Sequence, residues 1–96
     1  MPRFAWDSDK DARLRATRGI GFEEIVFQME SGNLIEILEH PQAERYPGQR
    51  VFVVWCRDYA YLVLFVKSDE VALLKTIIPS RRVTRRIRQA SEAHED

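Results

Sequence analysis

The sequence is poor in the features that mark secreted, membrane-spanning and metal-binding proteins. Its 96 residues include a single cysteine, Cys56, which cannot form a disulfide within the chain and therefore favours a reducing compartment. The longest apolar stretch, residues 59–66, is far shorter than the roughly 20 residues that a membrane-spanning helix needs. Asp7, Asp9 and Asp11 occupy the stretch where a signal peptide would be apolar. We therefore expect a cytoplasmic protein with no membrane contact.

Motifs for metals, nucleotides and covalent catalysis are also missing. His40, His94 and Cys56 are isolated from one another, so no metal site is expected. The chain has no phosphate-binding glycine motif, no nucleophile elbow and no Cys–His pair in a known context. The sequence thus argues against ATP-dependent, NAD-dependent and covalent hydrolase chemistry, and no cofactor is expected.

The chain has no net charge, because 15 basic and 15 acidic side chains cancel, and this excludes a polybasic protein. The charges are nevertheless unevenly distributed. Residues 23–44 contain six glutamates and no basic residue, whereas residues 80–90 contain five arginines and no acidic residue. A short acidic tail with Glu92, Glu95 and Asp96 follows. Any attraction for nucleic acid must therefore come from a local patch.

The length and the 45% hydrophobic content fit one globular domain over residues 1–96. Ser8 and Asp11 resemble a capping box and Gly19 a stop signal, which predicts a helix over residues 8–18. A second helix begins at Phe22, with apolar residues at helical spacing, and ends at Gly32. Phe27 lies off that apolar stripe, and it belongs either to the edge of a wide core face, which we favour, or to a contact with a partner.

The period then changes to that of strands. Residues 34–39, 50–56, 59–66 and 71–78 are predicted as four strands, the middle two joined by a tight hairpin at residues 57–58. Pro79 ends the last strand and Ser80 can cap a final basic helix. The predicted fold class is therefore α+β, with two N-terminal helices, a four-stranded mainly antiparallel sheet and a C-terminal helix. We expect the helices to cover one sheet face and to leave the other for function.

The longest break between predicted elements, residues 40–49, combines groups suited to proton transfer and phosphate binding. Within it and just beyond lie a near-neutral base, a carboxylate, a phenol and two guanidinium groups. These residues are His40, Glu44, Arg45, Tyr46 and Arg50. The alternative is that they are the ordinary polar residues of a surface loop.

The final helix and the strand before it carry most of the remaining basic candidates. Arg81 and Arg82 begin the helix, where the dipole favours an anion such as phosphate. Arg85, Arg86 and Arg88 are instead typical of a solubilising face. Lys75 lies among apolar residues and needs a partner. It belongs either to a cationic pocket or to a salt bridge with one of the glutamates.

Two parts of the sequence resemble the BrnT family, the toxin halves of bacterial type II toxin–antitoxin pairs. In the N-terminal part, the likeness rests on an aromatic–acid pair, a glycine and a Phe-Glu-Glu helix start: Phe4, Trp6, Asp7, Lys10, Gly19, Ile20, Phe22, Glu23 and Glu24. In the C-terminal part, it rests on a closing strand and a basic helix: Ile77, Ile78, Arg81, Arg82, Val83, Thr84, Arg85 and Arg86. Together these parts cover about half the chain.

The resemblance implies a RelE-like fold and metal-free cleavage of RNA. It also implies a hetero-oligomer with a small DNA-binding antitoxin, of the ribbon-helix-helix type, whose complex represses its own operon. Such cleavage uses the 2′-hydroxyl of the substrate, so the protein need only move protons and stabilise charge on the phosphorane.

We assign the roles accordingly. Arg50, Arg81 and Arg82 would hold the scissile phosphate, Lys75 would stabilise the transition state, and His40 or Tyr46 would handle protons. Further contacts to RNA would come from three more arginines: Arg45, Arg85 and Arg86. This assignment requires Arg50 and Arg81 to lie within about 15 Å of each other, because two extended side chains must reach one diester.

The sequence also departs from the family. Leu14 and Arg18 replace an asparagine in the first helix and a histidine before the glycine, and Pro79-Ser80 replaces Ser-Ala before the first closing arginine. These departures favour the alternative function, a catalytically silent binding module that retains a toxin-like fold.

Overall fold

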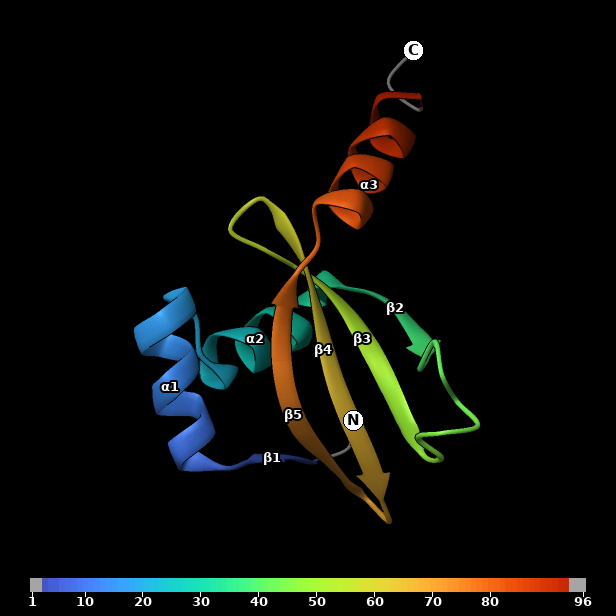
Figure 1. The fold of residues 1–96 in the computed structure, drawn as a ribbon. Coiled ribbons are helices and arrows are strands. Elements are labelled where there is room, and N and C mark those ends of the chain that lie inside the picture. Colours follow the sequence, from blue (N-terminus) through green and yellow to red (C-terminus); the bar gives the residue numbers. More distant parts are fainter. Residues whose placement is uncertain (1–2, 94–96) are drawn as a thin grey trace.

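The computed structural model describes residues 3–93 and has the predicted α+β class (Figure 1). Of the acidic tail, Glu95 and Asp96 lie outside this range, as does His94. In chain order the elements are β1 (Arg3–Trp6), α1 (Ser8–Arg18), α2 (Phe22–Gln28), a π-helical turn (Met29–Asn33), β2 (Leu34–Glu39), β3 (Gln49–Cys56), β4 (Tyr59–Ser68), β5 (Val71–Pro79) and α3 (Arg81–Ala93).

The sheet has five strands, in the order β1-β5-β4-β3-β2, instead of the predicted four. The four predicted strands form the antiparallel part, and β1 adds a parallel edge strand, from Arg3 opposite Val71 to Trp6 opposite Leu74. β1 was missed because four residues are too few to show a period, and because its partner strand is distant in the sequence. The sheet is therefore mixed.

The first helix covers residues 8–18 as predicted, but its N-cap lies one residue earlier than the sequence suggests. The N-cap is Asp7, whose carboxylate accepts the Lys10 N–H at 3.1 Å, so the predicted Ser8–Asp11 capping box is wrong. Asp11 instead accepts the N–H of Phe22 at 2.8 Å and thereby ties α1 to the start of α2. Gly19 ends α1 as predicted, with the positive φ of 70° that a left-handed C-cap requires.

The second helical segment changes form before it ends. α2 is α-helical to Gln28, and the π-helical turn continues to Asn33, with Gly32 at a φ of 93°. Phe27 on α2 is 64% exposed, so its expected place at the edge of the core is wrong. The helix buries Phe22 and Ile25 against the sheet, packs Val26 partly against the core and leaves Phe27 uncovered.

The antiparallel strands are joined as the turn residues predict, with one irregularity. Arg57 and Asp58 both have positive φ, as a two-residue hairpin turn requires. Along β4 and β5 the register shifts between Leu64, which pairs with Thr76, and Phe65, which pairs with Leu74. Lys75 is therefore an extra residue in a β-bulge, a feature that re-aims side chains.

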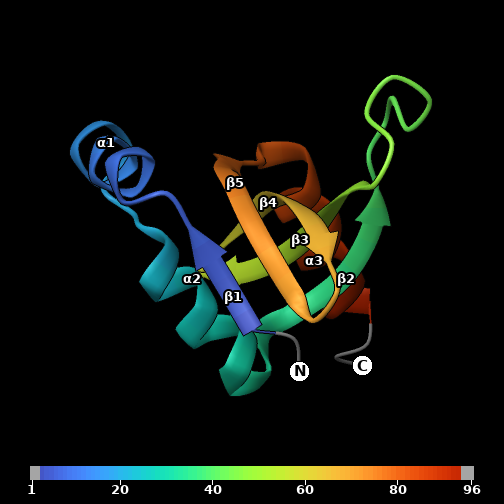
Figure 2. The ribbon, with the colours of Figure 1, turned by 90° about the horizontal axis from the view of Figure 1, so that it is seen from below.

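One sheet face carries the main core, and α1 and α2 cover it (Figure 2). The buried members of this core come from both layers: Leu14, Ile20, Phe22, Ile25, Met29, Phe52, Val54, Cys56, Val63, Phe65, Ala72, Leu74 and Ile77. The strands alternate, so Val51 and Val53 on β3, both buried, lie on the opposite face. That face was expected to carry functional groups, but its side chains on β3 and β4 are apolar.

α3 leaves the end of β5 and projects beyond the sheet (Figure 1). Thr84, the buried polar residue among those described, joins it to β4. The Thr84 hydroxyl accepts the Ala60 N–H at 2.8 Å and donates to the Ser80 carbonyl at 2.6 Å. Ser80 caps the helix as predicted, because its hydroxyl accepts the N–H of Val83 at 3.1 Å. Most of α3 therefore remains available to a partner.

Candidate functional site

The loop between β2 and β3 brings together four of the predicted site residues. The His40 and Tyr46 rings lie 4.7 Å apart between centroids, and the Arg45 guanidinium carbon lies 5.8 Å from the centre of the Tyr46 ring. Arg50 follows on β3, opposite Glu39 of β2. A base, a phenol and two cations thus share one end of the sheet, which we name the loop cluster.

A hydrogen bond to His40 favours one tautomer of its neutral ring. The backbone N–H of Gln42 donates to His40 Nδ1 at 3.0 Å. The neutral ring therefore carries its hydrogen on Nε2, which is the atom that can donate to a ligand. Two further bonds shape the loop, because the N–H groups of Arg45 and Tyr46 both donate to the Gln42 carbonyl at 3.0 Å.

The arginines of α3 form a second group of cations, at the end of the sheet opposite the loop cluster. Two of them have acidic partners: Arg88 lies 3.1 Å from Asp58, and Arg86 lies 3.9 Å from Glu36. Arg81, Arg82 and Arg85 are exposed and form no ion pair with a carboxylate among residues 3–93. These three side chains are the ones able to bind an anion without losing an existing partner.

The two groups do not meet, so the predicted grip of Arg50 and Arg81 on one phosphate is wrong. The N–H of Ser80 donates to the carbonyl of Ala60, which pairs with Trp55. Trp55 is five positions along β3 from Arg50, which places Ser80 about 16 Å further along the sheet and about 10 Å across it. Figure 1 shows α3 and the β2–β3 loop at different ends of the sheet. The required 15 Å is therefore exceeded.

Lys75 belongs to neither group. It lines a hollow with Asp7, Lys10 and Arg13 of the β1–α1 region, on the far side of the sheet from the loop cluster. Of the two alternatives from the sequence, the salt bridge with a glutamate is absent among residues 3–93. The cationic pocket is present, but its other members come from α1 and not from α3.

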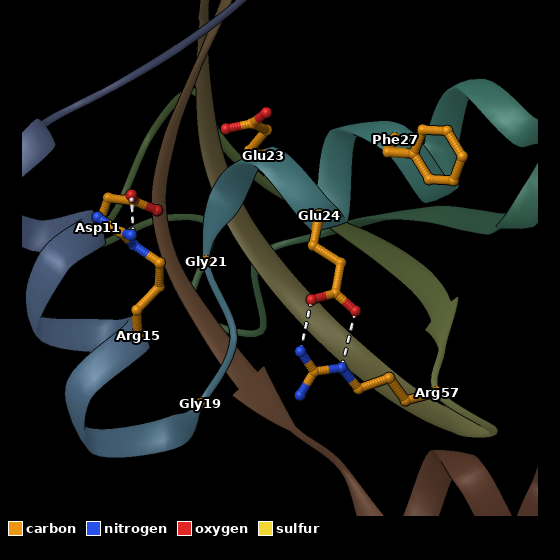
Figure 3. Close-up of a pocket in the computed structure, with 8 residues that line it drawn as sticks. All are labelled: Asp11, Arg15, Gly19, Gly21, Glu23, Glu24, Phe27 and Arg57. Carbon is orange, nitrogen blue, oxygen red and sulfur yellow. Dashed lines mark hydrogen bonds and ion pairs between the residues drawn. The ribbon is translucent and has the colours of Figure 1, made fainter.

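A mixed-charge hollow of about 570 Å³ lies between α1, α2 and the β3–β4 turn (Figure 3). Glu24 accepts two hydrogen bonds from Arg57, at 2.6 and 2.7 Å, and one at 3.3 Å from the thiol of Cys56. The bonds from Arg57 hold the pKa of Glu24 below its ordinary value. Burial, together with this carboxylate, raises the pKa of Cys56 to about 11, so the thiol stays protonated at neutral pH.

This hollow holds the chain together and offers no reactive group. Four of its five charged side chains pair within it, because Asp11 binds Arg15 at 3.1 Å and Glu24 binds Arg57, while Glu23 forms no ion pair among residues 3–93. Sequence reasoning did not single out the Glu24–Arg57 pair, and no local spacing indicates it, because the partners are 33 residues apart. It also missed Arg18, whose guanidinium donates to the Ile77 carbonyl at 2.8 Å and brings a cation to β5.

Comparison of the chain with protein-family models, curated proteins and solved structures finds no match. Within residues 3–93, no helix is long and apolar enough to cross a membrane. In the same range, His, Cys, Asp and Glu side chains form no group of three that could hold a metal ion. The function is therefore inferred from the geometry and from the resemblance of the sequence.

Proposed function

We propose that this chain is the toxin component of a type II toxin–antitoxin pair and that it cleaves RNA without a metal. α3 binds the RNA backbone, and the loop cluster supplies the proton-transfer groups. The observation that carries this proposal is the exposed, unpaired set Arg81, Arg82 and Arg85 on a helix that projects from the sheet. The BrnT-like sequence patterns support a RelE-like fold, and with it the cytoplasm as the place of action.

The RNA-binding role follows from charge and exposure. In a protein with no net charge, three free guanidinium groups within the first two turns of one helix make a local positive patch. Guanidinium groups bind phosphate oxygens in bidentate fashion. Each phosphate that is neutralised on single-stranded RNA adds about 0.7 to the steepness of the plot of log K against log salt concentration. One such contact therefore raises the affinity about fivefold when the salt concentration is lowered from 1 M to 0.1 M.

The loop cluster provides what cleavage by the substrate itself needs. The 2′-oxygen attacks the phosphorus, the bond to the 5′-oxygen breaks, and the proton of the 2′-hydroxyl passes to water. The Tyr46 phenol donates a proton to the leaving 5′-oxygen and regains one from water. The Nε2–H of His40 donates a hydrogen bond to the phosphorane, where Arg45 and Arg50 also stabilise charge. In the revised assignment, Lys75 and Arg81 have no part in this step, because they lie away from the loop.

The antitoxin is best accommodated by the sheet face that α1 and α2 leave uncovered. Its side chains on β3 and β4 are apolar but buried or half-buried, whereas Leu73 and Ile78 on β5 are each 37% exposed there. Exposed apolar surface of this kind is typical of a protein–protein interface. A partner bound there would also reach α3, which would couple antitoxin binding to loss of RNA binding.

A second candidate, the catalytically silent binding module, is favoured by the separation of the two groups. The proton-transfer residues and the unpaired arginines lie at different ends of the sheet, and the Nδ1 lone pair of His40 is already occupied by the Gln42 N–H. In this candidate α3 still binds RNA, but no bond is broken.

One set of measurements separates the candidates. Purified protein is assayed for binding and cleavage of single-stranded RNA, together with His40→Ala, Arg50→Ala, the double variant Arg81→Ala/Arg82→Ala, and Lys67→Ala as a matched control on β4. We expect His40→Ala and Arg50→Ala, the two loop variants, to lower kcat at least about tenfold with unchanged binding. This loss is equivalent to raising the activation free energy by about 1.4 kcal/mol. The double variant should lose about 25-fold in affinity at 0.1 M salt, and Lys67→Ala should match the wild type.

Binding by wild type without any cleavage establishes the silent module and overturns the nuclease. Unchanged cleavage in both loop variants also overturns the assignment of the loop cluster. Equal binding by wild type and the double variant overturns the role of α3 in both candidates. Expression in bacteria provides an independent check, because a toxin arrests growth and co-expression of the adjacent reading frame relieves the arrest.

A further inference from the structure

Three cations converge in a hollow between α1 and β5 that the proposed function does not use. Lys10 and Arg13 come from the first turns of α1, and Lys75 comes from the middle of β5. The hollow has a volume of about 250 Å³, and its remaining lining is Asp7, Leu73 and Leu74. We name it the α1–β5 hollow.

The fold builds this hollow through two local features. β1 stops pairing with β5 at Trp6 and Leu74, so the next residue of β5 has no strand beside it on that side. That residue is Lys75, the extra residue of the β-bulge, which the bulge frees from the regular alternation of the strand. The chain meanwhile turns at Asp7 into α1, which brings Lys10 and Arg13 to the same place.

The hollow has an excess of positive charge that nothing in the described structure neutralises. Lys10, Arg13 and Lys75 form no ion pair within 4 Å with any carboxylate among residues 3–93. Asp7 supplies one negative charge, but its carboxylate accepts the backbone N–H of Lys10 as the helix cap. Like charges gathered without partners repel one another, and a bound anion removes that repulsion.

Size and position identify the anion. The volume is below the 300 to 1,000 Å³ of usual small-molecule pockets, which suits a single phosphate group better than a whole nucleotide. Between the hollow and α3, Arg18 binds the carbonyl of Ile77, so cations follow β5 from Lys75 to Arg81. A nucleic-acid backbone is therefore attracted along β5.

We infer that the α1–β5 hollow binds a backbone phosphate of single-stranded RNA, whose chain runs from α3 along β5 to α1. This inference rests on the proposed RNA binding by α3. It predicts that affinity grows with RNA length until the strand spans both α3 and the hollow. It also predicts that the hollow contributes one phosphate contact.

The test compares Lys75→Gln and Lys10→Gln with the matched control Lys67→Gln, which removes the same charge from an exposed position at the end of β4. Binding of fluorescein-labelled oligouridylates of 3 and 12 nucleotides is measured by anisotropy over a range of salt. We expect Lys75→Gln and Lys10→Gln to weaken 12-mer binding about fivefold at 0.1 M salt and to flatten the salt slope by about 0.7. Lys67→Gln should change neither.

A second arm separates this inference from the proposed function. NMR amide shifts of the full chain are recorded with the 12-mer and with inorganic phosphate alone, and Arg81→Gln/Arg82→Gln is included. Shifts at Lys10 and Lys75 with the 12-mer, which Lys75→Gln abolishes, support the inference. If Lys75→Gln behaves like Lys67→Gln while Arg81→Gln/Arg82→Gln weakens binding, the hollow is refuted and α3 stands. If Lys75→Gln weakens binding and the α3 variant does not, the α3 proposal fails and the hollow stands. Shifts with phosphate but not with RNA overturn the RNA assignment.

Discussion

The Thr84 hydroxyl is the buried side-chain link between α3 and the sheet, and Thr84→Val tests how much it contributes. Valine has nearly the shape of threonine, so packing is retained while the Ala60 N–H loses its acceptor. Ala60 is fully buried, and an unsatisfied buried donor destabilises a protein by about 1 to 3 kcal/mol. The Ser80 carbonyl loses less, because it still accepts the backbone N–H of Thr84 at 3.1 Å. For a domain of this size, each 1 kcal/mol lowers Tm by about 4 to 8 °C.

Urea unfolding and amide hydrogen exchange measure this effect. We expect Thr84→Val to lower the free energy of unfolding by about 1 to 3 kcal/mol and to speed exchange of the Ala60 amide. Thr84→Ser keeps the hydroxyl and loses one methyl group, so it should cost about 1 kcal/mol and leave the Ala60 amide protected. An unchanged free energy of unfolding in Thr84→Val, with a protected Ala60 amide, would refute the reasoning.

Two further predictions concern the hollow in Figure 3. Arg57→Ala should lower stability slightly at neutral pH, because both partners of the ion pair are partly exposed. Since Arg57 holds the pKa of Glu24 below its ordinary value, the stability from this pair is present above about pH 4.3 and is lost as the pH falls through the lowered value. Urea midpoints of wild type and Arg57→Ala should therefore converge in acid, and a constant gap would contradict the pairing. Cys56, with a pKa of about 11, should react with iodoacetamide at pH 7.5 at least about 100-fold more slowly in the native protein than in urea, as followed by mass spectrometry. Equal rates in the two states would show that the thiol is neither buried nor held protonated.

Much of the fold could be predicted because its signals are local. Helical spacing from Phe22, the left-handed residue at Gly19 and the hairpin at residues 57–58 depend only on neighbouring residues. The strands β2 to β5 were found for the same reason. β1 was not, because pairing with β5 is a tertiary event, and the cap at Asp7 was misplaced by one residue because Ser8 is an equally suitable capping type.

The candidate site was harder to predict because it depends on register. The loop cluster was found, since His40, Arg45, Tyr46 and Arg50 are close in sequence. The distance from Arg50 to Arg81 depends on which ends of β3 and β5 lie together, and the sequence does not specify this. Lys75 was expected among buried apolar residues and in need of a partner, but the β-bulge leaves it exposed and without an ion pair among residues 3–93.

The pairing of β1 with β5 has a consequence for how the protein is made. During synthesis on the ribosome, the backbone groups of Arg3 to Trp6 have no strand to pair with until Val71 to Leu74 have been made. Phe4 and Trp6, which pack against the core, stay exposed for the same interval. The sheet therefore closes late, and only after closure do Lys10 and Lys75 come together. A nascent chain that does not yet include Lys75 therefore has no α1–β5 hollow and cannot bind nucleic acid there.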